Sequence, residues 1–243
     1  MACLRVLHTA DLHNRLDRDR AQTLARLRRD ADALLLDSGD AVGAANITVR
    51  RCEPVLELMN EAGYHAMVVG NREYYFRRRG LLHKTGSARF AVLSANIVAR
   101  GGGPPGHIQP WAIFTTAAGR VAVVGLSRIM IRPGCLLELL SDLRFLRWRE
   151  AIARALQQVR SQADWLVVLS HLGERRDREL VQRHPELDLV LCGHQHRAGY
   201  ELLGPRPTLL SHPGAHARSV ALIEIERRAD GPTRLDWRLL ELP

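Results

Sequence analysis

The stretch LRVLHTADLH occupies residues 4–13 and begins with an apolar run that has the length of a buried β-strand. The run is followed by Asp11 and His13. Side chains two residues apart point to the same side of an extended segment, so we expect this carboxylate and this imidazole to face one point. Both groups are common metal ligands. One such strand end would mean little, because a single histidine there is most often a surface or core residue.

The same arrangement recurs along the chain. Five further apolar runs end in or precede such residues. The run at 33–37 leads to Asp37 and Asp40, and the run at 65–69 leads to Asn71 and Arg72. The runs at 165–170, 187–192 and 208–211 lead to His171, to His194 and His196, and to His212 and His216. In open α/β sheets, ligands bind beyond the carboxyl ends of the strands, where several loops converge. The recurrence therefore predicts one shared site rather than six unrelated surface positions.

The predicted ligands offer oxygen and nitrogen donors without a thiolate, which suits manganese, iron, zinc or nickel better than a structural zinc cage. Seven ligands are too many for one tetrahedral ion, so the pattern favours two ions that share a carboxylate. Asp37 could be a further ligand, but we expect it to stabilise the loop that carries Asp40.

The remaining pattern indicates an α/β protein with mixed sheets. Helical spacing of apolar residues predicts helices at 19–31, 53–63 and 149–160, between runs typical of strands. The runs at 208–211, 220–226 and 234–242 alternate more and are typical of antiparallel strands. The segment at 127–145 is expected to be irregular and to overhang the site. This pattern does not distinguish one sheet from two.

Composition limits the class of protein. The chain has 243 residues, 46% hydrophobic and 25% charged, which predicts a single globular domain over 1–243. No apolar stretch approaches the roughly 20 residues of a membrane helix, so no membrane partner is expected. The N-terminus does not resemble a signal peptide, and the four cysteines form no C-x-x-C pair, so a cytoplasmic location is expected. The oligomeric state is not predicted.

The positive charge has two interpretations. The formal net charge is +9, and Lys84 is the only lysine among 35 basic residues. Such a charge could attract nucleic acid. We favour a compositional bias toward arginine, because the arginines are scattered and no aromatic and basic tract is typical of a strand-binding channel. Nucleic acid is therefore a possible partner but not the favoured one.

In order along the chain, the motifs resemble those of the calcineurin-like metallophosphoesterases, and within them the 5′-nucleotidase branch. The motifs are D-x-H (Asp11, His13), G-D (Gly39, Asp40), G-N (Gly70, Asn71), S-H-L-G (170–173), G-H-x-H (193–196) and VLSANIV (92–98). The resemblance covers most of the chain. It implies two packed mixed β-sheets flanked by helices, an αββα sandwich, over a single catalytic domain.

The resemblance also implies a dinuclear centre. One metal would take Asp11, His13, Asp40 and His196, and the other would take Asp40, Asn71, His171 and His194, with Asp40 bridging. Two divalent ions are implied, with Mn²⁺ as the first choice and Fe, Zn or Ni as alternatives. The implied reaction is hydrolysis of a small phosphate ester, either a phosphodiester or a nucleotide-like phosphomonoester, by attack of a metal-bridging hydroxide. Nucleotide specificity is not carried over, because the sequence has no room for the second domain of that branch.

Arg72 departs from the family pattern. Family members have G-N-H-E, and here Arg72 replaces the histidine, while Tyr75 replaces the aspartate that orients it. Arginine can stabilise negative charge but cannot serve as a general acid. We expect Asp40 and Arg72 to act in catalysis, and Asn71, Arg72 and His216 to contact the substrate phosphate. The alternatives are that His212 or His216 supplies the proton, or that the chain is a metal-binding regulatory module with weak or no turnover.

Overall fold

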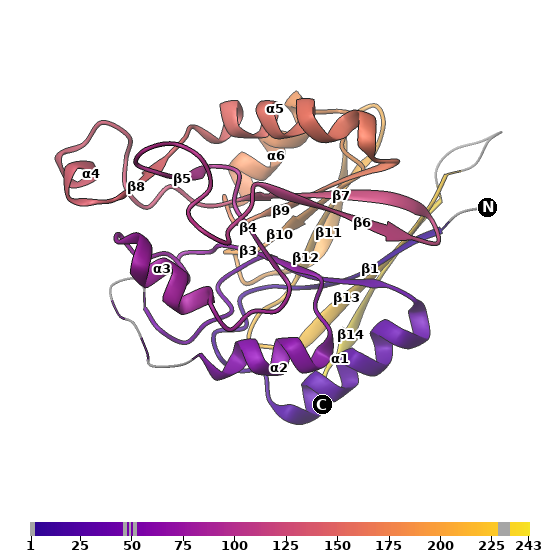
Figure 1. Cartoon of the computed structure of the whole chain (residues 1–243). Coiled ribbons are helices and arrows are strands. Elements are labelled where there is room, and N and C mark those ends of the chain that lie inside the picture. The colour runs from indigo at the N-terminus through magenta and orange to yellow at the C-terminus, as the bar shows by residue number, and fades with distance from the viewer. Residues whose placement is uncertain (1–2, 46–47, 49, 51–52, 228–233) are drawn as a thin grey trace.

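The structure is a computed structural model that describes residues 3–45, 48, 50, 53–227 and 234–243. Two six-stranded sheets form its centre (Figure 1). The first has the order β14 (Arg234–Glu241), β13 (Ser219–Glu226), β1 (Cys3–Thr9), β2 (Leu34–Asp37), β3 (Ala66–Val68), β4 (Ala91–Leu93). The second has the order β11 (Ala198–Leu203), β12 (Thr208–Pro213), β10 (Leu189–Cys192), β9 (Trp165–Ser170), β7 (Gly119–Leu126), β6 (Trp111–Thr116). A separate short sheet pairs β5 (Ile97–Ala99) with β8 (Leu143–Phe145).

Each large sheet has a block of parallel strands with antiparallel strands added, at one edge of the first sheet and at both edges of the second. In the first sheet, β1, β2, β3 and β4 are parallel neighbours, and β13 and β14 are added in antiparallel pairs. In the second, β7, β9, β10 and β12 are parallel neighbours, and β6 and β11 flank them in antiparallel pairs. The carboxyl ends of parallel strands meet at one edge of a sheet, so both blocks send their loops toward one end of the molecule.

The two sheets pack face to face, and helices cover both outer faces. The core between the sheets contains Val6 and Leu36 from the first sheet and Val167 and Leu191 from the second. In Figure 1, α5 (Trp148–Val159) and α6 (Glu174–Arg183) lie above the sheets, and α1 (Arg18–Ala31) and α2 (Pro54–Ala62) lie below them. The αββα sandwich is therefore confirmed.

The helix ends follow local chemistry. The Asp17 side chain accepts a hydrogen bond from the backbone N–H of Arg20 at 2.9 Å and caps α1. Pro54 occupies the first turn of α2, and Gly63 ends that helix with φ of 78°. The predictions for both helices and for α5 are confirmed to within a few residues.

Several elements differ from the expectation. The short strands β5, β8 and β11 and the helices α3 (Arg78–Thr85), α4 (Leu136–Leu140) and α6 were not predicted. The segment at 127–145 is therefore only partly irregular, since it contains α4 and β8. The prediction of an antiparallel strand at 208–211 is confirmed for the pairing of β12 with β11 and wrong for its pairing with β10, which is parallel. β12 is also buried along its whole length. Among the described residues, no helix is long and apolar enough to cross a membrane.

Candidate metal centre

Five of the seven candidate ligands have a left-handed backbone conformation. The φ angles are 52° at Asp11, 48° at His13, 58° at Asp40, 74° at His194 and 54° at His196. This conformation costs a non-glycine residue on the order of 1 kcal/mol or more, and such strain concentrates at functional sites. Hydrogen bonds between the loops hold it in place.

The loop after β1 is fixed to its neighbours by three of these bonds. The backbone N–H of Asp11 donates to the carbonyl of Gly39 at 2.9 Å, and that of His13 donates to the carbonyl of Asp40 at 3.0 Å. The N–H of His194 donates to Asp11 Oδ2 at 2.8 Å. The loops that follow β1, β2 and β10 are therefore locked together.

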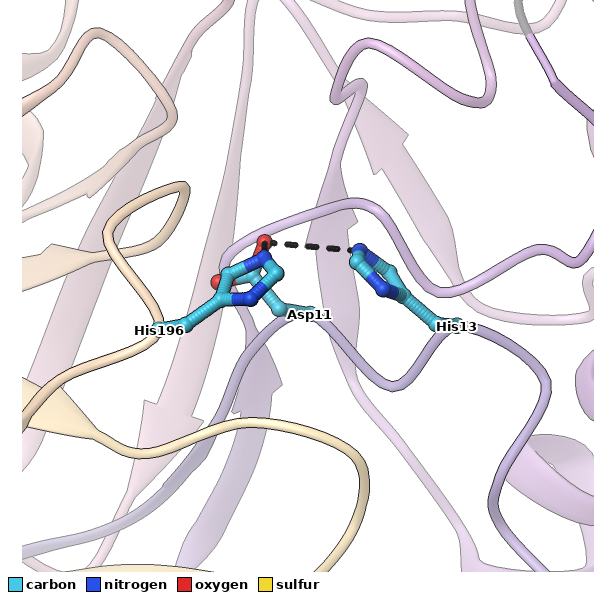
Figure 2. Close-up of side chains that lie close together, drawn as sticks. All are labelled: Asp11, His13 and His196. Atoms are coloured by element: carbon cyan, nitrogen blue, oxygen red, sulfur yellow. Dashed lines mark ion pairs between the residues drawn. The ribbon is translucent and has the colours of Figure 1, made fainter.

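Asp11, His13 and His196 form the first candidate group. Nε2 of His196 lies 3.4 Å from Asp11 Oδ1, and Nε2 of His13 lies 3.8 Å from the same oxygen. Figure 2 shows the His196 ring over the Asp11 carboxylate and the His13 ring facing the same carboxylate from a different loop. These ligand atoms lie within 4.8 Å of one another, which is close enough to hold one ion.

Asp40, His171 and His194 form the second group, and their ligand atoms also lie within 4.8 Å of one another. Asp40 Oδ2 lies 3.5 Å from His171 Nε2, and it also lies 3.7 Å from His13 Nε2 in the first group. One carboxylate oxygen therefore faces both groups, as a bridging ligand must.

Buried polar atoms without partners test whether this site fits metal ions. Among the described residues, nine buried side-chain nitrogen or oxygen atoms make no hydrogen bond. Four of them belong to predicted ligands: Asp11 Oδ1, His13 Nε2, Asn71 Oδ1 and His171 Nε2. Leaving a buried polar atom unpaired costs roughly 1–3 kcal/mol. The unpaired atoms of Asp11, His13 and His171 lie in the two candidate groups and indicate a missing partner there. The donor set is oxygen and nitrogen only, and it fits divalent cations.

The histidines are prepared to bind a cation. Nδ1 of His171 donates to the carbonyl of Ser38 at 2.6 Å, which turns Nε2 toward Asp40. Burial opposes protonation of His171, but Asp40 and Asp11 outweigh it and raise its pKa to about 9, so a metal ion on Nε2 must displace a proton. Burial, together with the charges of His171 and Arg128, lowers the pKa of His194 to about 4. For Asp40, burial opposes ionisation, but the contacts with His13 and His171 outweigh it and hold the pKa of the carboxyl well below its usual range. A neutral imidazole and an ionised carboxylate are the forms that bind metal.

Glycines allow the strand ends to approach closely. A methyl group on Gly193 would overlap the carbonyl oxygen of Ser38 and lie 2.9 Å from His171 Nδ1. A methyl group on Gly70 would overlap the backbone nitrogen of Asp40 and lie 2.9 Å from Glu73 Oε2. Neither glycine has a positive φ, so these positions require the absence of a side chain rather than an unusual turn.

Asp37 and Glu73 take structural positions. Asp37 is buried and accepts hydrogen bonds from the Thr9 hydroxyl at 2.7 Å and the Gly39 N–H at 2.8 Å. These bonds fix the turn before Asp40, as expected. Glu73 is buried within the turn that follows β3. It anchors that turn by accepting from the Gly70 N–H at 2.8 Å.

Arg72 lies beside the second group. Its backbone N–H donates to Asp40 Oδ1 at 2.7 Å, and its Nη1 donates to the carbonyl of Gly43 at 3.3 Å. Lys84 in turn donates from Nζ to the Arg72 carbonyl at 2.7 Å. The structure therefore places the Arg72 backbone beside Asp40, while the guanidinium reaches the Gly43 carbonyl, and the catalytic and phosphate-binding roles of Asn71 and Arg72 stay predictions.

The two further histidines occupy different places. Nε2 of His216 lies 3.3 Å from His13 Nδ1, and its ring centroid lies 5.4 Å from that of His196. His216 also lines a cavity of about 380 Å³ with Arg15, Arg20 and Arg218. His212 is buried in β12, and burial, together with the charge of Arg197, lowers its pKa to about 4. His216 therefore adjoins the candidate site, and His212 belongs to the strand.

Arg128 was not identified from the sequence. It follows β7 by two positions, and its Nη1 lies 2.8 Å from His194 Nε2. Its place after an apolar strand matches that of the other site residues and is the signal that could have revealed it. The segment at 127–145 was expected to be irregular and to overhang the site, but no residue in it was singled out.

Comparison with known proteins identifies the family. A profile of calcineurin-like phosphoesterases matches residues 4–198. The chain is 29% identical over 208 residues to a probable 5′-nucleotidase of Treponema pallidum, covering 78% of this chain and 34% of that protein. It is 28% identical over 220 residues to the 5′-nucleotidase of Bos taurus, covering 79% and 38%. The chain thus spans little more than a third of the length of these relatives.

Solved structures show the same fold. The 5′-nucleotidase precursor of Thermus thermophilus superposes with a TM-score of 0.84 at 23% identity, covering 99% of this chain and 54% of that one. The NAD nucleotidase of Haemophilus influenzae superposes with a TM-score of 0.81 at 21% identity, covering 99% and 56%. Together with the profile match over most of the chain, these findings show that the chain belongs to the calcineurin-like phosphoesterase family.

Proposed function

We propose that the chain is a dinuclear metal-dependent phosphoesterase that hydrolyses a small phosphate ester. The observation that carries this proposal is the position of Asp40 Oδ2, 3.7 Å from His13 Nε2 and 3.5 Å from His171 Nε2. One oxygen that faces two groups of possible ligands suits two cations that share a carboxylate. Mn²⁺ is the proposed ion, and Fe, Zn and Ni are the alternatives.

The charges favour a phosphate ester as the substrate. Two divalent ions with the carboxylates of Asp11 and Asp40 leave a formal charge of about +2, which attracts an anionic phosphate. Bound ions of this kind supply Lewis acidity and lower the pKa of water. The protein supplies the ligands and, at Arg72, a permanent positive charge that stabilises negative charge on phosphate oxygens.

Arg72 also restricts which leaving groups the proposed reaction can use. A guanidinium stays protonated and cannot transfer a proton to a departing oxygen. Among esters, we therefore favour those whose leaving group departs without protonation, including phosphodiesters of good leaving groups. The names of the relatives, 5′-nucleotidase and NAD 5′-nucleotidase, support a nucleotide-like substrate as the second choice.

Hydrolysis of two model esters tests the proposal. The protein, loaded with Mn²⁺, is assayed with bis-p-nitrophenyl phosphate and with p-nitrophenyl phosphate, beside His194→Ala and the exposed-histidine control His83→Ala. We expect turnover that is lost in His194→Ala and kept in His83→Ala, and the preferred ester separates a diesterase from a monoesterase. Metal binding without turnover of either ester would instead favour the regulatory module that the Arg72 and Tyr75 replacements motivate.

A further inference from the structure

Arg128 is held in the wall of the candidate metal centre by a rigid turn. The Asn96 side chain accepts from the Ser127 N–H at 2.8 Å and donates to the Ser127 carbonyl at 2.7 Å. The hydroxyl of Ser127 lies 2.9 Å from that of Ser94. Both backbone groups of the residue before Arg128 are thus fixed by the buried segment 94–96, and this preorganises the arginine.

The guanidinium has one partner in the described part of the chain, and that partner is not a carboxylate. Nη1 donates to His194 Nε2 at 2.8 Å. The side chain forms no ion pair with a described residue, and it is only partly exposed. A methyl group on Gly173 would lie 3.5 Å from His194 Cδ2 and 3.6 Å from Arg128 Nη1, which places Gly173 directly against this pair.

The contact is incompatible with a metal on His194. A neutral imidazole has one N–H and one lone pair, and a guanidinium has five donors and no acceptor. If the metal takes the Nε2 lone pair, Arg128 loses its acceptor. If the metal takes Nδ1, the proton moves to Nε2, and Arg128 again faces a donor. Metal binding at either nitrogen therefore ends this hydrogen bond.

We propose that Arg128 is a phosphate-binding residue that occupies His194 until metal binds and then turns to the substrate phosphate. This inference rests on the proposed function. A released guanidinium beside two cations requires an anion, and its planar fork matches two non-bridging phosphate oxygens. The ligand class is a phosphate ester or inorganic phosphate with at least two free oxygens.

Binding measurements test this exchange without turnover. Arg128→Gln is compared with the wild type and with Arg132→Gln, an exposed arginine on the same loop. Mn²⁺ is titrated into metal-free protein by calorimetry, and inorganic phosphate is then titrated into the Mn²⁺-loaded protein. We expect Arg128→Gln to bind Mn²⁺ at least as tightly as the wild type, because a competitor for the lone pair is gone. We expect its phosphate affinity to fall roughly ten- to a hundredfold, the effect of losing hydrogen bonds to a charged group. Arg132→Gln should change neither.

The outcomes separate this inference from the proposed function. Weaker Mn²⁺ binding in Arg128→Gln would make the arginine a structural support of His194, and unchanged phosphate affinity would remove it from the substrate site. Either result overturns the inference. If Mn²⁺ and phosphate bind as expected but neither ester is hydrolysed, the proposed function fails and the role of Arg128 in phosphate binding stands. Arg128→Lys keeps the charge without the fork, and its phosphate affinity should lie between those of the wild type and Arg128→Gln.

Discussion

Glu73 Oε2 accepts a hydrogen bond of 3.0 Å from the backbone N–H of Asp40. The same oxygen accepts from the Gly70 N–H at 2.8 Å, and Oε1 accepts from the Val42 N–H at 3.0 Å. Glu73 is fully buried, so these three bonds satisfy its carboxylate. One side chain thereby fixes the backbone on both sides of the candidate bridging ligand.

Glu73→Gln should destabilise the protein and loosen the metal centre. An amide keeps one acceptor oxygen but directs an NH₂ group toward a backbone N–H, and a buried donor left unpaired costs about 1–3 kcal/mol. We expect a lower melting temperature for the metal-free protein and weaker Mn²⁺ binding. Glu57→Gln, an exposed position on α2, is the control. An unchanged melting temperature would show that Glu73 does not hold the loop.

The dinuclear arrangement predicts different metal stoichiometries for two variants. Asp40→Asn removes the shared carboxylate and should weaken both ions by more than about a hundredfold. His196→Ala should lose only the ion of the first group and keep one ion on Asp40, Asn71, His171 and His194. Calorimetry with Mn²⁺ measures both, with exposed Asp19→Asn as the control. Loss of a single ion in Asp40→Asn would exclude a bridging role.

Much of this arrangement is predictable from sequence because strand ends are local features. The strand at 4–9 and the Asp11 and His13 that follow it are visible as an apolar run with two polar residues, and parallel sheets bring such ends together. Helix α6 was missed because its sequence, ERRDRELVQR, has only Leu180 and Val181 as apolar residues, and tertiary packing overrides that weak pattern. Strands such as β8 are three residues long, too short for a periodic signal.

For Arg128, the sequence shows its place after an apolar strand but not the contact that fixes it. Its position depends on Asn96 satisfying both backbone groups of Ser127, a contact between segments 31 residues apart. The motif VLSANIV indicated the family but not this contact. Hydrogen bonds between distant loops, like that of Glu73 with Asp40, have no periodic trace in a sequence.

Restoring the family histidine should change leaving-group preference. Arg72 contacts Asp40 through its backbone N–H, so a side-chain change leaves that bond in place. Arg72→His introduces a group able to donate a proton, and Arg72→His/Tyr75→Asp adds the carboxylate that orients it. We expect turnover of phenyl phosphate to rise about tenfold relative to p-nitrophenyl phosphate, and more in the double variant, since general acid catalysis contributes roughly 10²–10⁴-fold. Arg72→Met supplies no proton and should not show the rise. An equal change for both esters would contradict the prediction.

Lys84 ties the Arg72 turn to the loop after β2. It is the only lysine in the chain and is fully buried. Its Nζ donates to the carbonyls of Ala45 and Arg72, each at 2.7 Å, and to that of Tyr74 at 3.4 Å. Burial lowers the pKa of Lys84 from 10.5 to about 8, although Glu73 and Glu53 oppose the shift. Lys84→Met would leave these carbonyls without their donor and should lower the free energy of unfolding at pH 7 by about 1–3 kcal/mol.

The pH dependence of that difference gives the sharper test. Between about pH 8 and 10.5, the unfolded chain keeps the lysine proton that the folded chain has lost. Stability rises with pH wherever the unfolded state binds more protons, so Lys84 adds to wild-type stability through this window, by at most about 1.4 kcal/mol per pH unit. The difference in unfolding free energy between the wild type and Lys84→Met should therefore widen from pH 8 to 10.5, as measured by urea denaturation. For Arg89→Met, whose guanidinium is exposed and does not titrate here, the difference should stay constant. A gap for Lys84→Met that narrows as the pH rises would mean that the folded protein holds the lysine proton more tightly than the unfolded chain does.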